Sequence, residues 1–99
     1  MKKGKTSGSF HEILIEDLKD PEFSAEYLNN AIEENDPKYF LKALRNVAEA
    51  MGGMTKVAQR SHLSRMTLYR IFSKKGNPEF YSLLDILKAL KLKFVFKAA

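Results

Sequence analysis

Apolar side chains recur at helical spacing along three segments, and each segment opens on a proline that follows Asp or Asn. The three pairs are Asp20-Pro21, Asp36-Pro37 and Asn77-Pro78. Such a pair places an N-cap residue before a proline at the first helical position, where the missing amide is harmless. We predict helices over residues 21 to about 35, 37 to about 51, and 78–91. The residues expected to face the core are Tyr27, Leu28, Ala31, Ile32, Phe40, Leu44, Val47, Ala48, Phe80, Leu83, Leu84, Leu87 and Leu90.

Residues 54–72 carry two shorter helical patterns around a tight turn. In the first, Val57 and Ala58 come about one turn before Ser61, whose small side chain permits a second helix to cross closely. Leu63 is expected to fill the space between the two helices. Gly52-Gly53 separates this pair from the helix before it. Together with the three longer helices the pair makes five, so we predict an all-α fold.

The second short helix is expected to begin at Ser64, because a serine hydroxyl can accept a hydrogen bond from an unpaired amide of the first turn. The residues that recur toward the core are Leu68, Ile71 and Phe72. The residues left facing outward are Arg65, Met66, Thr67, Tyr69 and Arg70. A basic, aromatic face at the start and middle of a second helix is typical of a helix that reads DNA bases. The alternative is that these side chains only form a solvent-exposed helix face and bind nothing.

Charge separates the two halves of the chain. Residues 10–50 hold ten acidic and four basic side chains, whereas residues 54–78 hold six basic and no acidic ones. Clustered cations repel one another unless a polyanion binds them, and phosphates supply most sequence-independent DNA affinity. The residues expected to contact phosphate are Thr55, Lys56, Gln59, Ser64, Lys74, Lys75 and Asn77. The net charge of +5 therefore hides two opposed surfaces.

Four runs carry a resemblance to a known family: GGMTKVA, LSRMTLYR, the GNP at residues 76–78 and LLDILKAL. They resemble the helix-turn-helix of Xre/Cro-type (lambda-repressor-like) repressors, and most closely the HigA-type antitoxins, also called addiction-module antidote proteins. The likeness extends over roughly residues 18–96. His62 departs from the pattern, since such turns usually carry glycine in the left-handed conformation.

The resemblance implies an antitoxin of a type II toxin–antitoxin module. Such a protein neutralises a RelE/ParE-superfamily (HigB-like) toxin, typically an mRNA-cleaving ribonuclease, and represses its own operon by binding double-stranded operator DNA. Because such toxins are usually basic, acidic side chains are the candidate toxin contacts. They are Glu12, Glu16, Asp17, Glu22 and Glu26.

Three other interpretations remain open. In the first, the acidic side chains of the N-terminal half only solubilise two amphipathic helices. In the second, the chain is a stand-alone Xre-type repressor with no toxin partner. In the third, it is a protein-interaction module that has lost DNA binding.

The chain ends carry weaker patterns. Residues 93–97 alternate as Lys, Phe, Val, Phe, Lys, which predicts a short strand that pairs with a second copy in a homodimer through Phe94, Val95 and Phe96. Simple packing of the two rings on the last helix is the alternative. Residues 10–19 fit a short helix or an extended arm. Residues 1–9 are expected to form a flexible basic tail. The alternatives are an arm that contacts phosphate and a remnant of expression.

Length and composition limit what else the chain does. Ninety-nine residues, 44% of them hydrophobic, suffice for a single domain over residues 10–99, with acidic helices over 10–50. There is no cysteine and no apolar run long enough for a membrane span. His11 and His62 show no ligand-type spacing with acids, and no serine has a recognisable base. We expect a cytoplasmic, non-enzymatic protein with no metal, cofactor, membrane or small-molecule substrate.

Overall fold

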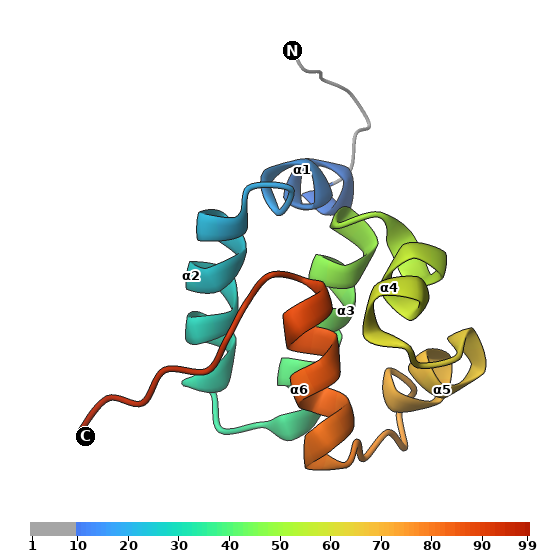
Figure 1. Ribbon diagram of the computed structural model, residues 1–99. Helices are drawn as coiled ribbons and strands as arrows, with labels where there is room; N and C mark the ends of the chain where they lie inside the picture. The colour runs from blue at the N-terminus through green and yellow to red at the C-terminus, as the bar shows by residue number, and fades with distance from the viewer. Residues whose placement is uncertain (1–9) are drawn as a thin grey trace.

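The computed structural model describes residues 10–99, so the tail predicted for residues 1–9 lies outside the described part. Six helices follow one another: α1 (Phe10–Asp17), α2 (Pro21–Ile32), α3 (Pro37–Ala50), α4 (Gly53–Ser61), α5 (Arg65–Ile71) and α6 (Phe80–Ala89). In Figure 1, α3 and α6 occupy the middle of the molecule, with α1 over one end, α2 on one side, and α4 and α5 on the other. The predicted all-α class is confirmed.

The prediction of five helices and a C-terminal β-strand is wrong. Residues 10–99 contain six helices and no strand. The additional helix is α1, formed by the segment for which an extended arm was the alternative. Residues 93–97 have no regular secondary structure, because a strand needs a neighbouring strand to pair its backbone groups and residues 10–99 offer none. The alternation of Lys and Phe therefore does not lead to a sheet.

The capping residues explain where α2 and α3 begin. Asp20 Oδ1 accepts a 3.0 Å hydrogen bond from the amide of Glu22, and Asp36 Oδ1 accepts one of 3.0 Å from the amide of Lys38. Both carboxylates thus satisfy amides that have no partner inside their helix. The third proline behaves differently: α6 begins at Phe80, two residues after Pro78. Pro78 lies instead in the wall of an apolar groove.

The core lies where α3 meets α1, α2 and α4, and where α6 packs against α4. Its largest fully buried side chains are Leu18, Leu44, Leu68, Ile86, Leu90, Val47 and Val57. Most of the side chains predicted to face inward do so. Ile32, Phe80 and Leu84 do not, with exposed fractions of 51%, 62% and 37%. Ile32 is the last residue of α2 and Phe80 is the first residue of α6.

The end of α6 turns the chain back on itself. The amide of Leu92 donates a 2.8 Å hydrogen bond to the carbonyl of Leu87, and Lys91 takes the left-handed conformation with a φ of 62°. This is the Schellman arrangement, which closes a helix and reverses the chain. Phe94 then stacks on Phe80, with ring centroids 6.2 Å apart. Within residues 10–99 no helix has both the length and the apolar character to span a bilayer.

Candidate nucleic-acid interface

Two glycines join α3 to α4. Gly52 and Gly53 have φ values of 116° and 86°, a region that side-chain-bearing residues rarely enter. A Cβ on Gly52 would lie 2.9 Å from the Cδ of Lys56. The predicted break between the two helices is therefore present at this glycine pair. The turn is short, so α4 begins directly beside the end of α3.

The turn between α4 and α5 consists of three residues. His62 lies in the left-handed region with a φ of 63°, where the resemblance expects glycine. Ser61 is only 4% exposed, and its Oγ accepts a 3.2 Å hydrogen bond from the amide of Leu63. A larger side chain at Ser61 has no room in this crossing, and the hydroxyl also supplies a partner for the turn.

Ser64 caps α5 as predicted. Its Oγ accepts a 3.0 Å hydrogen bond from the amide of Thr67 and donates one of 2.9 Å to Thr67 Oγ1. Leu68, Ile71 and Phe72 are buried, at 0%, 5% and 7% exposure. Because the cap fixes one end of this short helix and the core holds its inner face, α5 presents its outer face in one orientation.

That outer face is basic and aromatic. Arg65, Met66, Tyr69 and Arg70 are exposed, whereas Thr67 is half-buried with its hydroxyl bonded to Ser64. The guanidinium of Arg65 lies over the ring of Tyr69, 5.9 Å from the ring centre. A cation over an aromatic face is attracted by the ring, so these two side chains form a pair on the surface of α5.

The seven residues predicted to contact phosphate all lie exposed around α5. Thr55, Lys56 and Gln59 belong to α4, Ser64 lies at the cap, and Lys74, Lys75 and Asn77 belong to the segment after α5. Figure 1 shows this segment leading from α5 to the start of α6. Gly76 makes the bend possible, because a Cβ there would lie 1.7 Å from the carbonyl oxygen of Ile71.

Within the described residues, the basic surface has no carboxylate paired to it. Among residues 10–99, none of the six basic side chains of residues 54–78 forms an ion pair with a carboxylate. Arg60 is oriented by a different contact, a 3.4 Å hydrogen bond from its Nη1 to the carbonyl of Met51 at the end of α3. The sequence gives no signal for this contact, which ties α4 to α3. The remaining cations are exposed and available to an anionic partner.

The acidic side chains lie on other helices. All five candidate toxin contacts are exposed: Glu12, Glu16 and Asp17 on α1, and Glu22 and Glu26 on α2. Residues four apart lie on one helix face, so Glu12 and Glu16 share a face of α1, and Glu22 and Glu26 share a face of α2. Glu16 also lies 3.0 Å from the ammonium group of Lys19.

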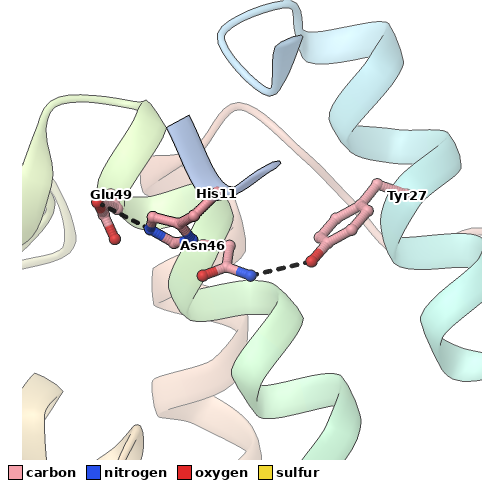
Figure 2. A network of polar contacts seen from close by, with 4 residues as sticks. All are labelled: His11, Tyr27, Asn46 and Glu49. Carbon is pink, nitrogen blue, oxygen red and sulfur yellow. Dashed lines mark hydrogen bonds and ion pairs between the residues drawn. The ribbon is translucent and has the colours of Figure 1, made fainter. Parts of the chain in front are cut away.

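Two polar contacts fix α1 and α2 on α3 (Figure 2). His11 Nε2 lies 3.4 Å from Glu49 Oε2, and Asn46 Nδ2 donates a 3.0 Å hydrogen bond to the Tyr27 hydroxyl. The partners are 38 and 19 residues apart. No periodicity or spacing relates residues so distant, and the sequence therefore did not reveal these contacts. They add polar links between the acidic helices and α3, whereas buried side chains such as Leu18 and Leu28 supply the packing.

The predicted dimer residues lie at the end of the chain without forming a strand. Phe94 stacks on Phe80 of α6, whereas the alternative interpretation expected both rings to pack on this helix. Val95 and Phe96 are 79% and 93% exposed. In the described residues, no group of three or more His, Asp or Glu side chains is placed to hold a metal ion.

Comparison with known proteins places this architecture in a family. A curated protein of Haemophilus influenzae (strain ATCC 51907 / DSM 11121 / KW20 / Rd), described as an uncharacterized protein, is 37% identical over 68 residues, which cover 69% of each chain. No solved structure gives a significant match. The family model described as "Probable addiction module antidote protein" matches residues 10–98, which is nearly the whole described chain. The chain therefore belongs to the family of probable addiction module antidote proteins.

Proposed function

We propose that this protein is the antitoxin of a type II toxin–antitoxin module, that it neutralises a RelE/ParE-superfamily (HigB-like) toxin, and that it represses its own operon by binding operator DNA. The observation that carries the DNA-binding part is the outer face of α5. Its arginines, its tyrosine and its methionine are exposed, and the surrounding basic side chains have no carboxylate partner within residues 10–99. A rigid helix with such a face suits insertion into the major groove.

In this proposal the residues of α5 and those around it have different roles. Arg65 and Arg70 bond the two acceptors of a guanine, and Met66 or Thr67 contacts a thymine methyl group. Tyr69 holds Arg65 in place and reaches a base or a phosphate. The seven exposed polar and basic residues around α5 contact phosphates, which position the protein without reading sequence.

The toxin-binding part rests on family membership and on the acidic faces of α1 and α2. These helices lie apart from α5 in the fold (Figure 1), so that a protein partner and DNA have separate surfaces available. An RNA-cleaving toxin carries positive charge to bind its substrate. Acidic side chains on the antitoxin would speed its association with such a partner and select against acidic proteins.

Binding to the DNA upstream of its own gene tests the regulatory part. We expect fluorescence anisotropy to show tighter binding to this DNA than to a shuffled sequence of the same length. Each phosphate contact should add about −0.9 to the slope of log K against log salt concentration. A protein that fails to bind either DNA would be a protein-interaction module instead.

Co-expression with the adjacent gene product tests the toxin part. The antitoxin should restore growth to cells that express the toxin, and the two proteins should purify as a complex. The double variant Glu22→Lys with Glu26→Lys should lose rescue, whereas Glu79→Lys with Asp85→Lys, which makes the same charge change on exposed residues near or on α6, should keep it. Operator binding without any rescue would identify a stand-alone repressor.

A further inference from the structure

Only one side of α1 packs against the rest of the fold. Leu14 and Ile15 are partly buried against the core, and Leu18, just beyond the helix, is fully buried. His11 lies on the same side, because residues 11, 14, 15 and 18 recur at helical spacing, and its ring approaches Glu49 of α3 (Figure 2). No residue of α1 itself is fully buried. The opposite side of the helix therefore faces away from the core.

The outer side of α1 carries two large apolar side chains. Phe10 is 91% exposed and Ile13 is 53% exposed. They are three residues apart, so they lie next to each other on the helix surface. A helix of eight residues depends on packing for its stability, and the packing of α1 comes from its inner side. Phe10 and Ile13 therefore add little to the fold, and adjacent exposed apolar side chains are typical of an interaction site.

Acidic side chains surround this apolar pair. Glu16 and Asp17 follow Ile13 by three and four residues, which places both beside it, and Glu12 lies one turn before Glu16. All three carboxylates are exposed. Lys19, 3.0 Å from Glu16, is the only lysine or arginine between residues 10 and 37. An apolar centre within a charged rim is the usual anatomy of a protein–protein interface.

The charge of this rim limits what can cover the surface. The carboxylates would repel the phosphates of nucleic acids and the headgroups of anionic lipids. A second copy in a two-fold interface would bring the same acidic rim against itself, because such an interface pairs one surface with its own equivalent. A basic protein with an apolar depression complements both the carboxylates and the apolar side chains.

We infer that Phe10 and Ile13 anchor the antitoxin in its toxin, and that Glu16 and Asp17 face basic side chains of that partner. The inference rests on the proposed function and adds which residues carry most of the binding energy, since a few buried side chains usually dominate an interface. In Figure 1, α1 covers one end of the molecule and α5 lies away from it. The toxin and the operator DNA then occupy different parts of one antitoxin.

Substitution of the two apolar side chains tests this anchor. Surface plasmon resonance with the purified, immobilised product of the adjacent gene measures binding of the full chain. Phe10→Ser with Ile13→Ser should bind at least about thirtyfold more weakly than the parent, mainly through faster dissociation. The matched control Val95→Ser with Phe96→Ser, which removes two exposed apolar side chains near the C-terminus, should bind like the parent. Circular dichroism melts and operator binding establish that each variant is folded.

The acidic rim should act on a different rate. Glu16→Gln with Asp17→Asn should slow association several-fold at low salt and less at high salt, because rim charges mainly steer the encounter. The loss caused by the two serine substitutions should persist at high salt. A serine variant that binds the toxin as tightly as the parent would overturn the inference and leave the proposed function standing, whereas a parent that fails to bind would overturn both. Self-association of the free protein that the serine substitutions abolish would identify a second copy as the occupant and also overturn the inference.

Discussion

The hydroxyl of Ser24 donates a 2.7 Å hydrogen bond to the carbonyl oxygen of Leu18, and both residues are fully buried. Leu18 follows α1, and Ser24 lies in the second turn of α2. The bond therefore joins the two ends of the α1–α2 connection inside the core. The bond gives the Leu18 carbonyl a partner. This carbonyl lies beyond the end of α1 and would otherwise be buried without a hydrogen bond.

Replacing Ser24 by alanine should destabilise the fold. The substitution removes the donor and leaves the Leu18 carbonyl unsatisfied, which costs about 1–3 kcal/mol. Urea unfolding followed by circular dichroism measures the change in the free energy of unfolding. Asn30→Ala, an exposed substitution on the same helix, is the control and should change it little. Equal stability of the two variants would show that the buried bond contributes nothing.

The substitution His62→Gly should stabilise the protein. A side chain at a φ of 63° is strained, and glycine relieves the strain at the cost of some chain entropy, for a net gain of about 0.5–1 kcal/mol. His62→Val should act in the opposite direction, because a β-branched residue tolerates this conformation least. Thermal melts of both variants show whether each substitution raises or lowers the melting temperature. A lower melting temperature for His62→Gly would indicate that the imidazole makes a compensating contact.

Two substitutions at Ser64 separate its capping role from its proposed phosphate contact. Ser64→Ala removes the cap of α5 and should lower the free energy of unfolding by about 1 kcal/mol. Ser64→Asp keeps a capping oxygen and should retain stability, but its charge should weaken DNA binding. Melts without DNA and anisotropy with operator DNA measure the two effects. Undiminished operator affinity in the aspartate variant would argue against a phosphate near this cap.

Arg65 and Lys75 should respond differently to truncation. Arg65→Ala should remove about 1–3 kcal/mol of discrimination between the operator and altered sequences, because a bidentate guanine contact is lost. Lys75→Ala should weaken binding to all sequences alike and reduce the salt dependence. Affinities for the operator and a set of single-base variants, measured at several salt concentrations, distinguish the two. Uniform weakening by Arg65→Ala would mean that this arginine contacts only the backbone.

Gly76→Ala should be poorly tolerated. The added methyl group would lie 1.7 Å from the Ile71 carbonyl oxygen, so the backbone must shift, at a cost of about 1–3 kcal/mol. The neighbouring exposed change Lys74→Ala serves as the control for stability. Since Gly76 shapes the segment that carries Lys74 and Lys75, operator affinity should fall as well. Melting temperatures and anisotropy report the two effects, and an unchanged melting temperature would contradict the predicted clash.

Local signals in the sequence were sufficient for much of the candidate site. Ser64 caps α5 and Ser61 is buried at the crossing, as their size and hydrogen-bonding capacity predicted. Leu68 and Ile71 face the core, so the exposed face of α5 follows from helical periodicity alone. Such features depend on residues within a few positions of one another. The roles of these side chains on DNA remain predictions.

Other features required the packed chain. Residues 93–97 alternate like a strand, but a strand also needs a partner, and pattern alone does not supply one. Residues 10–19, of which eight form α1, were ambiguous because so short a segment is too little for periodicity to separate a helix from an extended arm. Pro78 was predicted to start a helix, but Glu79 takes an extended conformation as the N-cap and α6 begins at Phe80.

By itself, the sequence determined the all-α class, the caps of α2, α3 and α5, and the separation of acidic from basic segments. It also showed the resemblance to antidote proteins, which the family match confirms. These depend on short-range hydrogen bonds, helical periodicity and composition. Only the tertiary structure decided that α1 is a helix in which His11 lies beside Glu49 of α3, and that Phe94 stacks on Phe80 beside an open groove. Those contacts join residues far apart in the chain, and their positions depend on how whole helices pack.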